Sequence, residues 1–253
     1  MGVLDNLNRV RRQIATAAIR AGRDPDQVKL VAVTKNVPVE IIGELLTHGV
    51  NSLGENRAQE LLQKRHKLPP DVDWHFIGHL QTNKVKKIIG KVSLIHSLDR
   101  WPLALEIHRT ACAAGMVARA LVQVNAAGEK TKFGLYPQEV EEFVAEASRL
   151  SGLEICGLMT IAPRFENPEE ARPVFRQMKE LTLRLKNRLQ EIKLDYLSMG
   201  MSGDYEVALG EGANILRIGT AIFGERVLEG HGSPVRGGQD SPAKHYNLKN
   251  EEG

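Results

Sequence analysis

Short apolar runs alternate with amphipathic helical patterns along most of the chain. Eight runs have the length and the β-branched or aromatic content of buried strands, and a helical pattern separates each run from the next. The predicted strands span Leu30–Thr34, Ser52–Leu53, Trp74–Ile77, Val92–Ile95, Ala120–Val124, Glu154–Leu158, Tyr196–Ser198 and Ile215–Ile218. Strands that are joined through helices form right-handed crossovers, so the pattern predicts a parallel sheet.

The number of these units favours a barrel. The predicted helices span Val39–Thr47, Arg57–Lys67, Asn83–Ile89, Trp101–Ala114, Gln138–Leu150, Glu169–Ile192 and Tyr205–Leu209. Eight βα units in 253 residues predict an α/β protein with a single-domain (β/α)₈ TIM barrel. The alternative is an open doubly wound sheet, which more often carries a glycine-rich loop after its first strand. The segment Lys35-Asn-Val-Pro38 contains no such loop.

The two ends of the chain lie outside the alternation. Residues 3–20 place apolar side chains at spacings of three and four, which predicts an extra N-terminal amphipathic helix packed on the barrel. Charged residues interrupt this segment throughout, so it matches neither a signal peptide nor a spanning helix. Glycine and proline are frequent from Leu228 onwards. We expect a barrel domain over residues 1–226 and a flexible C-terminal tail over residues 227–253.

Charge and cysteine content narrow the class of protein. The chain has 34 Lys and Arg against 31 Asp and Glu, a balance that indicates neither a nucleic-acid nor a membrane partner. Its two cysteines, Cys112 and Cys156, are far apart and match neither a disulfide framework nor a zinc motif. We therefore expect a cytoplasmic protein without a metal site.

Lys35 is the first candidate for chemistry. In a barrel, the residues that follow each strand build the active face, and Lys35 follows the first strand. A lysine at the end of a buried strand either marks where the strand reaches solvent or faces a cleft with a chemical task. Taken alone, Lys35 fits the first interpretation better.

The loops after the last two strands favour the second interpretation of Lys35, a chemical task. They read Ser198-Met-Gly-Met-Ser-Gly-Asp204 and Arg217-Ile-Gly-Thr220, in the barrel positions that frequently bind phosphate. Glycine lets backbone N–H groups approach an anion, and Ser202 and Thr220 can add hydroxyl donors. Each loop alone could be an ordinary capped turn. A phosphate cup that faces an imine-forming lysine is what pyridoxal 5′-phosphate requires.

Six motifs resemble one known family. They are Val31-Ala-Val-Thr-Lys35, Gly54-Glu-Asn56 with Gln59-Glu60, Trp74-His-Phe-Ile-Gly-His-Leu-Gln81, Gly157-Leu-Met-Thr-Ile161, Ser198-Met-Gly-Met-Ser202, and Arg217-Ile-Gly-Thr220 with Ile222-Phe-Gly-Glu225. Together they resemble the pyridoxal phosphate homeostasis proteins from about Leu4 to Arg226. The resemblance implies a barrel similar to the N-terminal domain of alanine racemase that binds pyridoxal phosphate without an established catalytic activity.

The resemblance also implies roles for single residues. Lys35 would form the imine with the cofactor, and Arg217 would face its pyridine nitrogen. Ser202, Gly219 and Thr220 would hold the phosphate, while Asn56 would approach the cofactor and Met159 would form a wall. No residue is assigned a catalytic role.

Carrier and enzyme remain competing interpretations. A protonated pyridine nitrogen normally needs a facing carboxylate, and arginine cannot replace it because arginine itself stays protonated. Racemases of the similar fold use a tyrosine from a partner subunit as second base, and no such arrangement is evident here. We favour a monomeric protein of vitamin B6 homeostasis, with apo forms of pyridoxal-phosphate enzymes as candidate partners. The alternatives are a weak amino-acid racemase or related enzyme, and a barrel enzyme acting on phosphorylated sugars.

Two further groups of residues have structural explanations. His75 and His79 could carry protons, although a histidine at the end of a core strand is more often a hydrogen-bonded structural group. The lysines between residues 84 and 91 could meet an anionic partner, but a solvated helix face explains them better.

Overall fold

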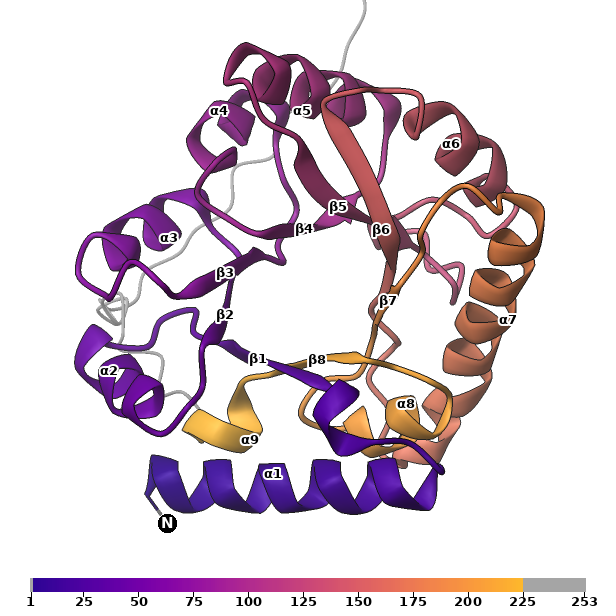
Figure 1. The fold of residues 1–253 in the computed structure, drawn as a ribbon. Helices are drawn as coiled ribbons and strands as arrows, with labels where there is room; N and C mark the ends of the chain where they lie inside the picture. The colour runs from indigo at the N-terminus through magenta and orange to yellow at the C-terminus, as the bar shows by residue number, and fades with distance from the viewer. Residues whose placement is uncertain (1, 225–253) are drawn as a thin grey trace, which may run out of the picture.

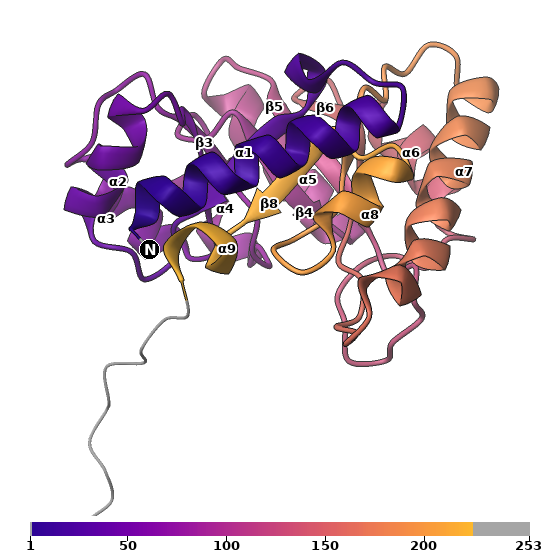
Figure 2. The same ribbon diagram turned by 90° about the horizontal axis from the view of Figure 1, so that it is seen from below.

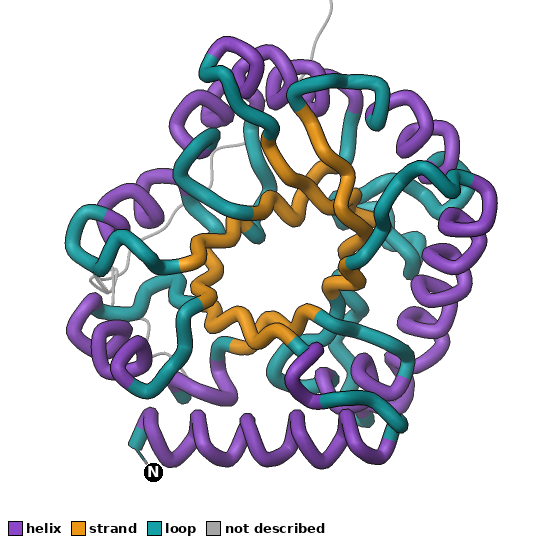
Figure 3. The backbone as a smooth tube through the Cα atoms, in the orientation of Figure 1, coloured by secondary structure: helices purple, strands orange, loops and turns teal. Residues whose placement is uncertain are grey.

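Eight parallel strands close into a barrel in the computed structural model, which describes residues 2–224 (Figure 1). Each strand pairs with the next in the sequence, and the eighth pairs with the first, so the ring has no open edge (Figure 3). The strands are β1 Lys29–Val33, β2 Ser52–Glu55, β3 Asp73–Phe76, β4 Leu94–Leu98, β5 Ala118–Val124, β6 Leu153–Thr160, β7 Tyr196–Ser198 and β8 Ile215–Ile218. The predicted barrel is confirmed, and the open doubly wound sheet is excluded.

A helix follows each strand and covers the outside of the ring (Figure 1). These helices are α2 Val39–Thr47, α3 Ala58–Arg65, α4 Val85–Ile88, α5 Trp101–Ala113, α6 Val140–Ala147, α7 Arg172–Arg188, α8 Tyr205–Gly210 and α9 Thr220–Phe223. The helix predicted over Glu169–Ile192 extends beyond α7 at both ends. A 3₁₀ turn over Pro168–Ala171 precedes it, and Leu189 leaves the helical conformation. Leu189 and Ile192 pack against the core instead, which turns the chain back toward β7.

The predicted N-terminal helix is α1, Val3–Arg20. It runs along the outside of the barrel beside α8 and α9, as the view from below shows (Figure 2). Leu7, Val10 and Ile14 form its buried stripe, which follows the spacing of three and four residues. Within residues 2–224 no helix is both long and apolar enough to cross a bilayer. The predicted C-terminal tail lies outside the described residues.

The barrel separates two apolar cores. The larger core lies between the strands and the surrounding helices. The smaller consists of Val31, Leu94, Leu121, Cys156, Met159 and Ile215, which come from five strands. Because both faces of each strand are buried, the strands read as near-continuous apolar runs. Polar side chains share the interior with the smaller core, and they reach the site described below.

A bulge in β6 depends on Gly157. The register of β6 against β5 skips one residue here, since Ala120 pairs with Ile155 and Leu121 pairs with Gly157. A Cβ at residue 157 would lie 1.9 Å from the carbonyl oxygen of Tyr196 in β7, and the φ of 153° disfavours any L side chain. Only glycine therefore allows β6 and β7 to pair at this point.

We predict that Gly157→Ala lowers the free energy of unfolding by at least about 2 kcal/mol, because the new methyl group pushes β6 from β7. Gly43→Ala is the matched control. Residue 43 lies inside α2 with open space at the Cβ position, so alanine should stabilise the helix by about 0.5–1 kcal/mol. Urea unfolding of both variants measures this contrast, and equal effects would contradict the role assigned to Gly157.

Candidate functional site

A cleft of about 710 Å³ opens at the C-terminal ends of the strands. It lies among the segments that follow β1, β6, β7 and β8, which are distant in sequence and neighbours in the closed barrel. Its lining includes Lys35, Arg217, Gly219 and Thr220 together with the stretches 163–166 and 201–204. The structure thus brings together five of the seven residues expected at the site, the fifth being Ser202.

Two backbone N–H groups converge beside α9. The N–H groups of Gly219 and Ala221 both donate to the hydroxyl oxygen of Ser202, over N···O distances of 3.2 and 3.1 Å. Two donors therefore converge on the position of that oxygen. Convergent donors suit the oxygens of a phosphate, and the Ser202 hydroxyl can rotate to add a third donor. Thr220 starts α9 at the edge of the same cleft, with an exposed side chain.

Arg217 forms the floor of the cleft. Its side chain is only 4% exposed, and its guanidinium donates to Ser198 Oγ at 2.6 Å and to the carbonyl oxygen of Thr160 at 2.8 Å. Desolvation lowers the pKa of Arg217 to about 10, while the charge of Asp204 opposes the shift. The guanidinium therefore stays charged at neutral pH. Desolvation also raises the pKa of Asp204, which lies in the same cleft.

Lys35 lies two residues beyond the end of β1, in a tight turn, with its side chain exposed in the cleft. Asn36 adopts a left-handed conformation with a φ of 57°, which asparagine tolerates better than most residues. Among residues 2–224, the Lys35 side chain has no hydrogen-bond or ion-pair partner. Its amine is thus available to a ligand.

A buried ion cluster clamps the turn that carries Lys35. Lys64, from α3, donates to the carbonyl oxygen of Thr34 at 2.5 Å and pairs with Glu55 and Glu60 at 2.7 Å each. Glu60 also accepts from the N–H of Asn36 at 2.5 Å. The residues on both sides of Lys35 are therefore tied to the same cluster, which limits the positions that the Lys35 backbone can adopt.

The other two expected residues lie away from the cleft lining. Asn56 follows β2, and its Oδ1 atom is buried with no hydrogen-bond partner in the described part of the chain, residues 2–224. Such an orphaned acceptor costs free energy unless a ligand or water satisfies it. Met159 is fully buried in the smaller core of the barrel and is not among the residues that line the cleft.

Some contributors to the site were not predicted. The N–H of Ala221 could not be predicted from side-chain chemistry, because any residue other than proline could supply it. The segment from Pro163 to Glu166 follows β6 and lines the cleft, and its place after a strand was the available signal. His79, which the sequence offered as a possible proton carrier, is not among the residues that line the cleft. It stacks on Phe133, with ring centroids 3.8 Å apart, and its Nδ1 lies 3.3 Å from Asp99.

The donor set suits a small ligand with a phosphate at one end and a carbonyl group at the other. Two N–H groups and a hydroxyl can hold the phosphate, and the Lys35 amine can attack the carbonyl carbon. A charged arginine lies beneath the space between them. Within residues 2–224, no three His, Cys, Asp or Glu side chains gather closely enough to hold a metal ion.

Known proteins resemble the chain over its whole barrel. The family model described as "Alanine racemase, N-terminal domain" matches residues 6–227. The pyridoxal phosphate homeostasis protein of Aquifex aeolicus is 48% identical over 227 residues, which cover 89% of this chain and 99% of the relative. The structure of PipY from Synechococcus elongatus with pyridoxal phosphate bound is 34% identical, with a TM-score of 0.74, and covers 85% of this chain and all of PipY. A protein of unknown function from Bifidobacterium adolescentis has a TM-score of 0.82 at 33% identity, covering 87% and 94% of the two chains.

We predict that Lys64→Met lowers the free energy of unfolding at pH 7 by about 3–5 kcal/mol, since Glu55 then remains buried without its partner. Desolvation already raises the pKa of Glu55, against hydrogen bonds from Lys64 and Thr34 that lower it. Without Lys64, ionised Glu55 penalises the folded state alone. The deficit should therefore be larger at neutral pH and shrink as the pH falls toward the ordinary Glu pKa of about 4.3, below which this carboxyl is protonated in both states.

Urea unfolding between pH 4 and 7 measures this dependence. Lys67→Met, at an exposed position just beyond the same helix, should change stability little at any pH. A deficit for Lys64→Met that is independent of pH would contradict the assigned ion cluster.

Proposed function

The chain belongs to the family of pyridoxal phosphate homeostasis proteins, and from this we propose that it binds pyridoxal 5′-phosphate in the cleft and serves vitamin B6 homeostasis. One observation carries the proposal. The free amine of Lys35 opens into the same cleft as the converging N–H groups of Gly219 and Ala221. The relatives that support it carry this activity in their names or contain the cofactor in their structures.

The residues fit the two reactive ends of the cofactor. Bound pyridoxal phosphate would supply an aldehyde for covalent capture and an electron-withdrawing ring. Lys35 would hold the aldehyde carbon through its Nζ atom, and the clamp around Thr34 and Asn36 would keep this amine in place. Ser202, Gly219 and Thr220 would bind the phosphate, together with the N–H of Ala221.

Arg217 favours a holding role over catalysis. Its guanidinium remains protonated at neutral pH, so it would donate a hydrogen bond to the ring nitrogen instead of leaving a proton there. A ring without that proton withdraws electrons less strongly. We therefore propose a protein that retains its cofactor without robust turnover. The alternative of a weak amino-acid racemase gains no support from this geometry.

The remaining assignments follow from position. Asn56 would approach the cofactor with its unpaired Oδ1, and Met159 would form the wall beneath it. Cys112 and Cys156 are both unpaired, which fits a reducing cytoplasm. We propose that the protein acts there as a monomer and passes its cofactor to apo forms of pyridoxal-phosphate enzymes.

Covalent capture of the cofactor tests the proposal. The purified protein mixed with pyridoxal phosphate should develop a visible absorption band, and borohydride reduction followed by peptide mapping should label Lys35. Lys35→Met should abolish the labelled peptide. Lys193→Met, at an exposed residue that precedes β7 on the opposite side of the barrel, should leave it unchanged. Labelling of another lysine, or of none, would refute the central assignment.

The phosphate cup can be tested apart from the amine. We predict that Ser202→Ala weakens binding of pyridoxal phosphate about tenfold, the effect of losing one hydrogen bond to a charged group. Its binding of pyridoxal, which has no phosphate, should not change. Ser148→Ala on the far surface of the barrel is the control, and spectroscopic titration gives the dissociation constants. A loss of the same size for both ligands would contradict the cup.

A further inference from the structure

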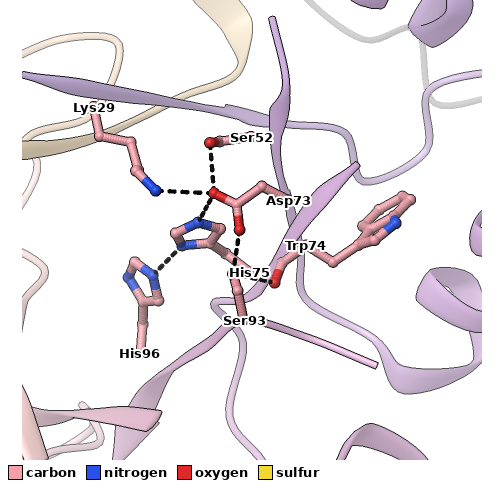
Figure 4. A network of polar contacts seen from close by, with 7 residues as sticks. All are labelled: Lys29, Ser52, Asp73, Trp74, His75, Ser93 and His96. Atoms are coloured by element: carbon pink, nitrogen blue, oxygen red, sulfur yellow. Dashed lines mark hydrogen bonds and ion pairs between the residues drawn. The ribbon is translucent and has the colours of Figure 1, made fainter. Parts of the chain in front are cut away.

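A chain of polar side chains crosses the interior of the barrel from Arg217 to the opposite end. Figure 4 shows its lower part, from His96 through His75 to Asp73. The contacts join Arg217 Nη1 to Ser198 Oγ at 2.6 Å, Ser198 Oγ to His96 Nδ1 at 3.0 Å, His96 Nε2 to His75 Nδ1 at 2.8 Å, and His75 Nε2 to Asp73 Oδ2 at 3.0 Å. Four strands contribute, namely β3, β4, β7 and β8.

The donors and acceptors of this chain allow one consistent direction. Arginine can only donate and an ionised carboxylate can only accept, so the two ends have fixed roles. Neutral histidines with hydrogen on Nε2 then complete the series, in which Ser198 donates to His96, His96 donates to His75, and His75 donates to Asp73. Every polar hydrogen in this series has an acceptor.

The opposite direction fails at two points. It would require His75 to carry two hydrogens, because Asp73 cannot donate to it. It would also make the Ser198 hydroxyl accept from both Arg217 and His96, and this hydroxyl has no other partner among residues 2–224 to receive its own hydrogen. Desolvation lowers the pKa of His96 well below its ordinary value, which also favours a neutral ring.

The buried charge of Arg217 needs compensation, and this series of polar side chains supplies it. A buried guanidinium normally pairs with a carboxylate, yet both hydrogen bonds that the Arg217 guanidinium donates within residues 2–224 go to neutral oxygens. Asp204 acts on it only through its field. Asp73 is ionised, because hydrogen bonds from His75, Ser93 and Lys29 outweigh desolvation and hold the pKa of Asp73 well below its ordinary range. Hydrogen bonds in a low-dielectric interior polarise one another, so the far carboxylate strengthens Ser198 as an acceptor.

We propose that Asp73, His75, His96 and Ser198 form a one-way hydrogen-bond relay that positions Arg217 and compensates its charge. The four are positioning residues, since they act on the cofactor site through Arg217. The part of this inference that concerns the cofactor depends on the proposed function, whereas the direction of the relay does not.

Other groups that face the relay leave its direction intact. Lys29 of β1 pairs with Asp73 at 2.9 Å, but its side chain is 38% exposed, so solvent screens much of its charge. Ser52 of β2 and Ser93 before β4 donate to the same carboxylate, which adds to its stabilisation as an anion. At the upper end, Asp204 is the charged group that acts on Arg217.

Nitrogen NMR of the protein without cofactor tests the direction. With ¹⁵N-labelled histidine, both His75 and His96 should be neutral at pH 7 with hydrogen on Nε2, and Asp73→Asn and Ser198→Ala identify their resonances. A doubly protonated His75, or hydrogen on Nδ1 of His96, would overturn the relay. This result needs no bound cofactor, so it stands if the proposed function fails.

The spectrum of the loaded protein tests the effect on the site. Asp73→Asn and Ser198→Ala should both lower, by about half a unit, the pH at which the visible band of bound pyridoxal phosphate changes. Both substitutions leave the positive charge of Arg217 less compensated, and an uncompensated positive charge favours loss of a proton nearby. Ser97→Ala is the matched control, since Ser97 is a buried serine beside His96 in β4 whose hydroxyl has no hydrogen-bond partner within residues 2–224. It should leave the profile in place.

Each outcome has one meaning. Wild-type protein that binds no pyridoxal phosphate refutes the proposed function. If the protein binds pyridoxal phosphate but the visible bands of Asp73→Asn and Ser198→Ala change at the same pH as that of Ser97→Ala, the relay is refuted. A change at a higher pH also refutes it. If the relay variants fail to fold, sequential assignment through the backbone identifies the His75 and His96 resonances of the wild-type protein, and their spectra decide.

Discussion

The burial of Arg217 is the constraint on which the mouth of the barrel depends. Its guanidinium donates to β7 and β6 while its backbone N–H donates to the carbonyl of Gly200. These bonds join three strands where direct pairing is sparse, because β7 and β8 share a single register pair. One buried charge thus positions the last two loops and requires acceptors deep in the barrel.

Lys35 is held by a different means. Its side chain stays free while Thr34 and Asn36 on either side are bound to the Lys64 cluster. This division keeps the amine available and the backbone restrained, which lowers the entropy lost when a ligand is captured. The site therefore combines a restrained amine, two directed N–H groups and a fixed cation. Each is supported by buried polar contacts that lie outside the cleft.

Several parts of the site were predictable because they follow the barrel geometry. Lys35, Ser202, Arg217, Gly219 and Thr220 all follow strands or lie near their ends, so a correct fold places them at one rim. Met159 lies in the inner core, since the bulge at Gly157 sets which residues of β6 face inward, and its role as a wall of the site stays a prediction. His75 was judged a structural histidine, and its contacts reach from Asp73 toward Arg217. The contacts from His75 to His96 and from His96 to Ser198 join positions about 20 and 100 residues apart and leave no local pattern.

The sequence by itself determined the eight βα units, the closed barrel, the family and most residues at the rim, because periodicity and turn residues act locally. The tertiary structure alone decided the converging N–H groups, the clamp around Lys35 and the direction of the polar chain through the interior. Those features depend on which side chains meet after the ring has closed. Burial then makes each unpaired polar group costly in free energy, so it determines which polar side chains pair with one another.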